Sequence, residues 1–187
     1  IRIFGKPYTE LTAKDRERIG VSLADSGFSQ FLTVRDVTAI LRNLYTRFDE
    51  ARFLEKCQRY ELPANKKIKD FSTGMQAKLK LLIAMSHDAD LLILDEWLIR
   101  PLPPQESYDM LEIVEARCHK STIFCTQYES EGWYTRIDPN PESDSPVSEA
   151  IMDRIIHNAY EVLVDGRVSM RERKGLKATR EGGGQDV

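Results

Sequence analysis

The sequence has few cysteines, no long apolar run and no strong excess of charge of either sign. Three cysteines occur among 187 residues and none lies in a CxxC pair, which argues against a disulfide framework and a structural zinc site. No apolar run approaches the roughly 20 residues that a membrane span needs. Lysine and arginine total 27 against 30 acidic residues, a formal charge of -3, so the net charge argues neither for nor against a polyanionic partner. We therefore expect a cytoplasmic globular protein.

The apolar residues that are present alternate between strand-like runs and helical spacing. Residues 91–96 (LLILDE) and 121–127 (STIFCTQ) predict buried strands. Because strand and helix alternate through the second half, we expect an α/β fold with a parallel sheet flanked by helices. Ligands of such sheets bind at the carboxyl ends of the strands. Helices are predicted at residues 32–48, where Thr33 and Asp36 form a capping box, at 50–61 as a charged hairpin, after the N-cap Ser72, at 105–117 and at 147–160.

The first helix is predicted to turn one apolar stripe inward, formed by Val37, Ile40, Leu41, Leu44 and Phe48. A short strand is predicted at residues 1–4 and a strand, turn and strand at 161–170, and Trp97 and Trp133 are expected to pack in the core or at its edge rather than to stack on bases.

Asp95 and Glu96 close the apolar run of the strand predicted at residues 91–96. If a nucleotide is present, the first carboxylate has the chemistry to hold Mg²⁺ and the second to orient or deprotonate an attacking water. The alternative is a strand end whose acids only face solvent. The pair by itself does not separate the two interpretations.

The segment FSTGMQAKLKLLIAMSHDADLLILDE, residues 71–96, favours the first interpretation. It resembles the signature helix and Walker B strand of the ATP-binding subunits of ABC transporters. Ser72, Thr73 and Gly74 fall on signature positions, where a serine hydroxyl and bare backbone N–H groups at a helix N-terminus bind phosphate. In that family the phosphate belongs to ATP on a second ATPase subunit, so the resemblance implies a dimer. Ala24 departs from the pattern, because it stands where the family has a glutamine.

Residues 91–176 instead resemble the C-terminal half of the IstB-like transposition helper ATPases, AAA+ relatives of the helicase loader DnaC. The stretches STIFCTQY, AIMDRIIHNAY and VSMRERKGL carry the likeness in that family's order. The resemblance implies that Thr126 and Gln127 lie at the sensor position, between the Walker B acid and the γ-phosphate. It also implies that Arg154 is an arginine finger for a neighbouring subunit. Two alternatives remain. The first is that Thr126 and Gln127 only end a strand, and the second is that Arg154 is a surface arginine paired with Asp153.

The phosphate-binding loop GxxxxGK[ST] occurs nowhere in the sequence. Its strand and helix are missing with it, so we expect a gap in a P-loop ATPase sheet. Little remains to hold the β- and γ-phosphates. A chain that begins at Ile1 in a strand-like segment also resembles a fragment of a longer protein. We therefore predict an ATPase-type domain with weak or no activity by itself.

The predicted organisation is an ABC-type portion at residues 1–96, with a helical subdomain at about 33–70, an IstB-like portion at 91–176 that completes the same sheet, and a flexible tail at 177–187. ATP and Mg²⁺ are the predicted cofactors. The leading hypothesis is an ABC transporter ATP-binding subunit, or part of one, that acts with a membrane permease and lies at the inner face of the membrane. The alternative is an IstB-like helper that acts with a transposase on DNA. A third hypothesis is a non-catalytic partner that offers Ser72 and Gly74 to a complete ATPase subunit.

Overall fold

The computed structural model describes residues 1–23, 28–139 and 146–164. Ile1–His157 forms one compact unit, and Asn158–Val187 forms a second. No helix in these described residues is long and apolar enough to cross a membrane. In chain order the elements are β1 (Arg2–Ile3), β2 (Lys6–Pro7), η1 (Tyr8–Glu10), α1 (Ala13–Arg16), β3 (Ile19–Ser22), α2 (Val34–Leu44), α3 (Glu50–Arg59), η2 (Ile68–Asp70), α4 (Thr73–Met85), β4 (Leu91–Leu94), α5 (Pro104–Ala116), β5 (Ser121–Phe124), η3 (Ser130–Gly132), α6 (Tyr134–Ile137) and α7 (Pro146–Ile156).

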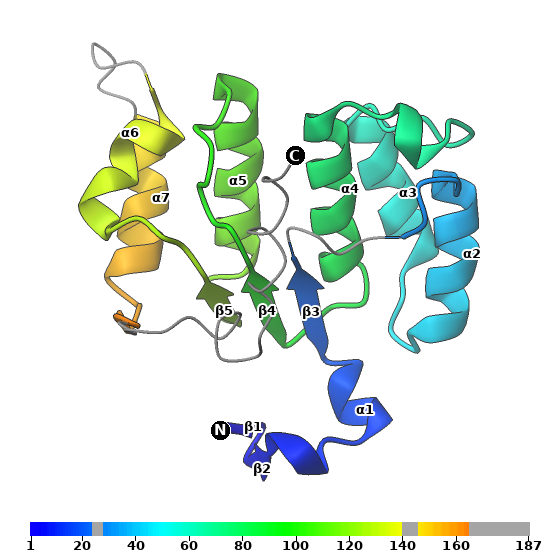
Figure 1. Cartoon of the computed structure of the whole chain (residues 1–187), viewed down its shortest axis with the longest axis horizontal. Helices are drawn as coiled ribbons and strands as arrows, with labels where there is room; N and C mark the ends of the chain where they lie inside the picture. Colours follow the sequence, from blue (N-terminus) through cyan, green and yellow to red (C-terminus); the bar gives the residue numbers. More distant parts are fainter. Residues whose placement is uncertain (24–27, 140–145, 165–187) are drawn as a thin grey trace, which may run out of the picture. The chain divides into compact units, whose positions relative to one another are not determined.

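The centre of the larger unit is a parallel sheet in the order β3-β4-β5 (Figure 1). Ile19 pairs with Leu91, and Leu91 pairs with Ser121, so the three strands start and end level with one another. Their carboxyl ends therefore meet at one edge of the sheet. This arrangement confirms the predicted α/β fold with a parallel sheet flanked by helices. The strands predicted at 91–96 and 121–127 end earlier than expected, at Leu94 and Phe124.

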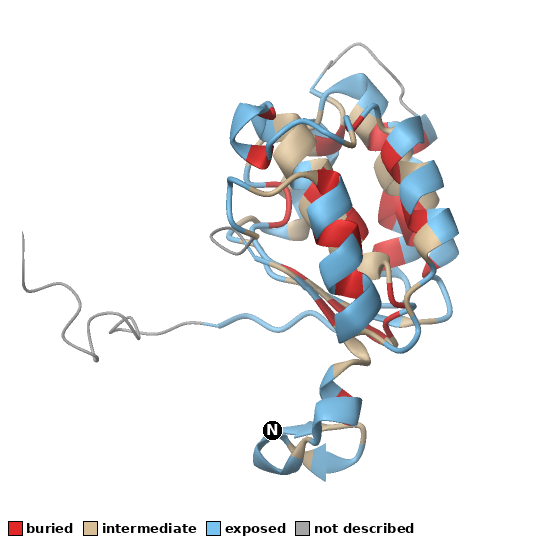
Figure 2. Ribbon diagram, turned by 90° about the vertical axis from the view of Figure 1, so that its right-hand side faces the viewer, coloured by how far each residue is buried: buried red, intermediate tan, exposed pale blue. Residues whose placement is uncertain are grey.

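Helices α4, α5 and α7 enclose a core against the sheet, and Figure 2 shows the buried residues gathered between helices and strands. Leu92 and Leu94 of β4 belong to this core, together with Trp97 and Trp133. The approach of α4 to β3 is close, because a Cβ built on Gly20 would lie 2.0 Å from the backbone oxygen of Ala84. Only glycine fits there. The two tryptophans pack in the core, as the sequence predicted.

The other face of the sheet is less covered. Val21, Ile93 and Ile123 lie in register across the three strands. Val21 is 40% exposed and Ile123 is 46% exposed, whereas parallel strands are usually buried on both faces. The apolar side chains on one face of the sheet are therefore buried, whereas those on the other face stay partly exposed in the described residues.

Helices α2 and α3 form a second hydrophobic cluster with the apolar side of α4, around Val37, Leu41 and Phe53. The capping box at Thr33 and Asp36 begins α2 as predicted. Two predictions here were wrong. Residues 50–61 form the single helix α3 and a turn, not a hairpin of helices. Ile40 and Leu44, predicted on the inward stripe of α2, are exposed because the helix is covered on only one side.

Both ends of the chain differ from the predicted strands. Residues 1–4 were predicted as a single strand, but β1 turns back through Phe4 and Gly5, both at positive φ, to pair with β2. Residues 161–170 were predicted as strand, turn and strand, but 161–164 form no strand, and the remainder lies outside the described residues. Ala24 and the predicted tail at 177–187 lie outside them as well. The predicted limits of the ABC-type and IstB-like portions remain predictions.

Candidate functional site

The carboxyl edge of the sheet carries the predicted acids. Asp95 follows β4 directly, and its N–H donates to the Ser22 oxygen of β3 at 2.9 Å. On the other side the Cys125 N–H donates to the Leu94 oxygen at 2.8 Å. These bonds fix the ends of the three strands against one another. The edge therefore brings Asp95 and Glu96 next to the strand end that continues into Thr126 and Gln127.

The backbone at the acids adopts an unusual conformation. Glu96 and Leu98 have φ values of 55° and 54°, in the left-handed region that non-glycine residues rarely occupy. The Trp97 N–H donates to the Cys125 oxygen at 2.8 Å, and the Trp97 and Leu98 side chains are buried in the core. The buried side chains and the backbone hydrogen bond therefore fix the conformation of this turn, and the two carboxylates face outward. Asp88, at the amino edge, has the same conformation with a φ of 52°, so the conformation fixes the direction of the carboxylates and does not by itself identify a functional site.

Neither acid has a cationic partner among the described residues. Asp95 and Glu96 are exposed, and no lysine or arginine of the described residues pairs with either of them. One internal contact is present, since the Glu96 N–H donates to Asp95 Oδ1 at 3.0 Å. Two unpaired carboxylates on a fixed turn are available for a cation or for a water molecule.

The oxygen ligands at this edge suit Mg²⁺. In the described part of the chain no three acidic, histidine or cysteine side chains gather into a metal cage. Mg²⁺ does not need such a cage, because it usually binds one or two carboxylates and completes its shell with waters and phosphate oxygens. Asp95, exposed and unpaired, fits that role.

The two residues predicted at the sensor position, Thr126 and Gln127, differ in their environments. Thr126 is half-buried, and its Oγ1 accepts a hydrogen bond from the Tyr128 N–H at 3.2 Å. Gln127 is exposed. Burial raises the pKa of the neighbouring Cys125 thiol, and the charge of Asp95 raises it further. Cys125 is therefore a neutral thiol near the site, a residue that the sequence patterns did not single out.

Ser72 caps α4 as predicted, because its Oγ accepts from the Met75 N–H at 3.2 Å. Thr73 and Gly74 form the first turn of this helix. The structure adds a carboxylate here: a Cβ built on Gly74 would lie 3.2 Å from Oε1 of Glu106, a residue of α5. Sequence patterns do not link positions 74 and 106, because their proximity depends on helix packing. No hydrogen bond or ion pair of the described residues joins this turn to Asp95.

Arg154 lies on α7 and pairs with Glu115 rather than with Asp153, at 2.7 Å between Nη2 and Oε1. Asp153 instead pairs with His157. Glu115 is close to the end of α5, which leads into the amino end of β5. Arg154 is thus directed toward the edge of the sheet opposite to Asp95. Its role as an arginine finger for a neighbouring subunit remains a prediction.

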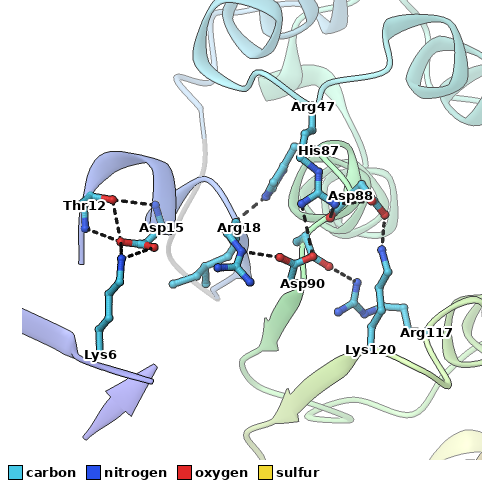
Figure 3. A network of polar contacts seen from close by, with 12 residues as sticks. Lys6, Thr12, Asp15, Arg18, Arg47, His87, Asp88, Asp90, Arg117 and Lys120 are labelled. Atoms are coloured by element: carbon cyan, nitrogen blue, oxygen red, sulfur yellow. Dashed lines mark hydrogen bonds and ion pairs between the residues drawn. The ribbon is translucent and has the colours of Figure 1, made fainter. Parts of the chain in front are cut away.

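The amino edge of the sheet carries a second group of acids, and these are paired (Figure 3). Asp88 forms ion pairs with Arg47 and Lys120, and Asp90 pairs with Arg18 at 2.6 Å and with Arg47 at 3.4 Å. Lys120 is the main cause that lowers the pKa of Asp88, and Arg18 is the main cause for Asp90. The network joins segments distant in the sequence at the base of the three strands.

Arg117 and His87 complete this amino edge. Arg117 is only 7% exposed and donates to the Ala89 oxygen at 3.0 Å, the Ser121 oxygen at 2.9 Å and Thr122 Oγ1 at 3.1 Å. His87 is buried, stacks on Tyr45 with ring centroids 3.9 Å apart, and has its Nε2 3.3 Å from the Ile19 oxygen. Burial lowers the pKa of His87, so the buried ring is neutral. This edge is structural.

The N-terminal hairpin is attached by one more carboxylate, which Figure 3 also shows. Asp15 accepts two hydrogen bonds from Lys6 Nζ, at 2.8 and 3.0 Å, and further bonds from the N–H and hydroxyl of Thr12. Lys6 is the main cause that lowers the pKa of Asp15. This ion pair joins β2 to α1, and it lies apart from the acids at the carboxyl edge.

Two sequence models of known families match this chain, and they overlap. The model of the ABC transporter family matches residues 1–99. The model of the IstB-like ATP binding proteins matches residues 67–178. Each match covers more than half of the chain, and the segment from α4 to the turn after β4 belongs to both.

Individual relatives also belong to these two groups, insertion sequence proteins and ABC transporter proteins. An insertion sequence ATP-binding protein of Sinorhizobium fredii, y4pL, is 38% identical over 85 residues, which cover 45% of this chain and 33% of that protein. The ABC transporter ATP-binding protein YtrB of Bacillus subtilis is 36% identical over 64 residues, which cover 34% of this chain and 22% of that protein. The chain thus spans a third or less of the length of these curated relatives.

Solved structures similar to this fold include the ATP-binding subunit of an ABC transporter, with a TM-score of 0.57 and 19% identity over 72% of this chain and 58% of that chain. A dimeric bacterial ABC transporter cassette gives a TM-score of 0.51 and 20% identity, over 65% of this chain and 57% of that chain. At these identities the likeness shows the fold. The chain therefore belongs to the ABC transporter ATP-binding family through its first half and to the IstB-like ATP-binding family through its second, on a fold of the P-loop ATPase type.

Proposed function

We propose that the carboxyl edge of the sheet is an ATP site with Mg²⁺. The observation that carries this proposal is the pair of exposed, unpaired carboxylates, Asp95 and Glu96, on a turn that the core holds in a left-handed conformation. The match to the IstB-like ATP binding proteins and the similarity to the ABC transporter ATP-binding protein YtrB agree with it. Asp95 would hold the metal, and Glu96 would orient or deprotonate a water molecule.

Bound Mg²⁺ would neutralise phosphate charge and lower the barrier for phosphoryl transfer to water. Thr126 and Gln127, next to Asp95 at the end of the adjacent strand, would place polar groups between the acid and the terminal phosphate. Since the sequence contains no GxxxxGK[ST] loop, this edge offers no lysine of that motif to the phosphates. We accordingly expect weak nucleotide binding by the isolated chain.

A second ATPase subunit would complete the site. The first turn of α4, residues 72–74, has the serine and the bare backbone that suit contact with phosphate on another subunit. A similar solved cassette is described as dimeric. Within this proposal the leading function is that of an ABC transporter ATP-binding subunit that drives a membrane permease.

The second candidate function is that of an IstB-like helper that hydrolyses ATP with a transposase on DNA. The match of residues 67–178 to the IstB-like model and the similarity to an insertion sequence ATP-binding protein favour it. Arg154 would then reach the ATP of a neighbouring subunit after leaving Glu115. DNA binding that weakens steeply with salt would support this candidate. Co-purification with an integral membrane protein would support the first.

Calorimetric titration of the purified chain with ATP, with and without Mg²⁺, tests the site itself. We expect weak binding that requires Mg²⁺, and tighter binding when a complete ABC ATPase subunit is added. A Glu96→Gln variant should bind ATP as the unchanged chain does but lose hydrolysis in the mixed complex. Glu112→Gln, which removes the same charge from a residue of α5 that pairs with Arg59, is the control. Binding of equal strength with and without Mg²⁺ would contradict the proposal.

A further inference from the structure

The turn that begins at Glu96 is closed by its own backbone and contains a residue in an unfavourable conformation. The Ile99 N–H donates to the Glu96 oxygen at 3.1 Å, so residues 96–99 form a tight turn. Leu98 occupies its third position with a φ of 54°, a conformation that such turns usually assign to glycine. A leucine persists there only if the surrounding contacts hold it.

Arg136 of α6 supplies contacts of this kind. Its Nε donates to the Leu98 oxygen at 2.5 Å, and its Nη2 donates to the Ile99 oxygen. The backbone takes part as well, because the Leu102 N–H donates to the Arg136 oxygen at 2.7 Å. Arg136 forms no ion pair within residues 1–23, 28–139 and 146–164, the part of the chain that the structure describes. Its donors therefore serve the turn rather than an acid.

The same guanidinium also contacts the segment that follows β5. Its Cζ lies over the Tyr128 ring, 3.8 Å from the ring centroid. The Tyr128 N–H donates to Thr126 Oγ1 at 3.2 Å, and the Tyr128 oxygen accepts from Trp133 Nε1 at 3.1 Å. One side chain thus joins the turn after β4, which carries the two acids, to the segment that carries Thr126 and Gln127.

The charge of Arg136 and its contacts have opposite effects on a metal ion at this edge. A guanidinium repels a cation, so by charge alone its removal would strengthen the binding of a metal ion. Residues that orient metal ligands from outside the ligand shell raise the affinity, so by its contacts the removal of Arg136 would weaken that binding. The sign of the change therefore shows which effect is larger.

We propose that Arg136 is a positioning residue of the carboxyl edge, which holds the turn of Asp95 and Glu96 against the segment of Thr126 and Gln127 so that both segments face one ligand. This inference rests on the proposed Mg²⁺ site at that edge. Arg136 is not itself a ligand. It acts through the two backbone oxygens of the turn and through the Tyr128 ring.

The test uses Mn²⁺ alone as the probe, because bound Mn²⁺ broadens the NMR signals of nearby nuclei. The readout is the broadening of the backbone N–H signals of Glu96 and Gln127. In the unchanged chain we expect both signals to broaden with one midpoint. In Arg136→Gln the midpoint for Glu96 should rise about tenfold, and the broadening of Gln127 relative to that of Glu96 should fall.

Two further variants accompany this change. Arg136→Lys keeps the charge but loses the fork of donors and the flat group, so its midpoint should rise in the same direction by a smaller factor. Arg59→Gln is the matched control. Arg59 also lies over a tyrosine, with its Cζ 5.9 Å from the centroid of the Tyr60 ring, but it belongs to α3 and pairs with Glu112. This control should leave both signals as they are in the unchanged chain.

The outcomes separate the two proposals. If Mn²⁺ broadens the signals of the unchanged chain but the midpoint in Arg136→Gln is equal or lower, the metal site stands and the positioning role is overturned. If Mn²⁺ broadens neither signal in any of the proteins, the proposed metal site is overturned, and the role of Arg136 with it.

Circular dichroism of each variant measures its folded fraction. A rise in the midpoint that only matches a loss of folded protein overturns the positioning role. If Arg136→Gln does not fold, Arg136→Lys decides: a raised midpoint at an unchanged folded fraction supports the role, and an unchanged midpoint overturns it.

Discussion

The two edges of the parallel sheet carry acidic residues in opposite situations. At the amino edge, Asp88 and Asp90 are each paired with two basic side chains. At the carboxyl edge, Asp95 and Glu96 face solvent with no basic partner in the described residues. The four acids lie within nine positions of one another on either side of β4. Sequence proximity and residue type are therefore poor guides to role, whereas the partners that folding supplies distinguish the paired acids from the candidate site acids.

The difference follows from what surrounds each end of β4. The amino edge collects Arg18, Arg47, Arg117 and Lys120 from four segments, and they compensate the acids and bond the carbonyls there. Among the described residues, no basic side chain forms an ion pair with the acids at the carboxyl edge. An uncompensated pair of carboxylates costs free energy through mutual repulsion. Its persistence on a strained turn agrees with the proposed cation site.

The largest effect that the comparison predicts is at the amino edge, in Arg117→Ala. The change removes three hydrogen bonds of a charged donor that is 7% exposed, and it leaves the Ala89 and Ser121 carbonyls without this partner. We expect a loss of about 3 kcal/mol in the free energy of unfolding. Urea unfolding followed by circular dichroism measures it. A loss below about 0.5 kcal/mol would mean that this edge does not hold the strands together.

Asp95→Asn should give the next largest effect, on binding rather than on stability. The amide cannot hold Mg²⁺ as a carboxylate does, so we expect Mg²⁺-dependent ATP binding to weaken by about tenfold or more. The melting temperature should stay the same or rise slightly, because one of two adjacent charges is removed. A large fall in the melting temperature would assign Asp95 a structural role, and the acids of the two edges would then not differ in role.

The pH dependence of stability sharpens the comparison through His87. Burial lowers the pKa of this ring in the folded chain, so the unfolded chain binds the proton more readily. The contribution of the neutral His87 ring to the free energy of unfolding should therefore be fully present above about pH 6.5 and should decline as the pH falls below that value. Asp88 and Asp90, whose pKa values are also lowered, lose their contribution only in stronger acid, below about pH 4.

The measurement is the urea midpoint between pH 8 and pH 5, for the unchanged chain and for His87→Gln. The variant should be less stable at pH 8, because the stacking on Tyr45 is lost. Its midpoint should depend less on pH in this range. Parallel pH curves for the two proteins would show that another group causes the decline.

The smallest effect is expected from Asp88→Asn, at the exposed part of the amino edge. Its partners Arg47 and Lys120 are partly solvated, and exposed ion pairs contribute little. We expect a loss of about 0.5 to 1 kcal/mol that shrinks as salt is added. Glu96→Gln, measured in parallel, should show no such loss, because it removes a charge without a basic partner in the described residues. Equal losses in the two variants would remove the distinction between the edges.

Local residue patterns were enough to predict several elements. The capping box of Thr33 and Asp36, the N-cap Ser72 and the buried run before Asp95 each appear where expected. The physical reason is that caps and strand runs depend on residues within a few positions of one another. Predictions that needed neighbours distant in the sequence did less well. Ile40 and Leu44 are exposed because no element covers that side of α2.

The sequence by itself determined the parallel α/β fold, the place of Asp95 and Glu96 at the end of a strand, and the likeness to two ATPase families on either side of that strand. Only the tertiary structure decided which acids are compensated, since the bases that pair with Asp88 and Asp90 come from distant segments. It also decided that Glu106 lies beside Gly74 and that Arg154 pairs with Glu115. Periodicity fixes the direction of a side chain along its own helix or strand, but packing between elements selects its partner.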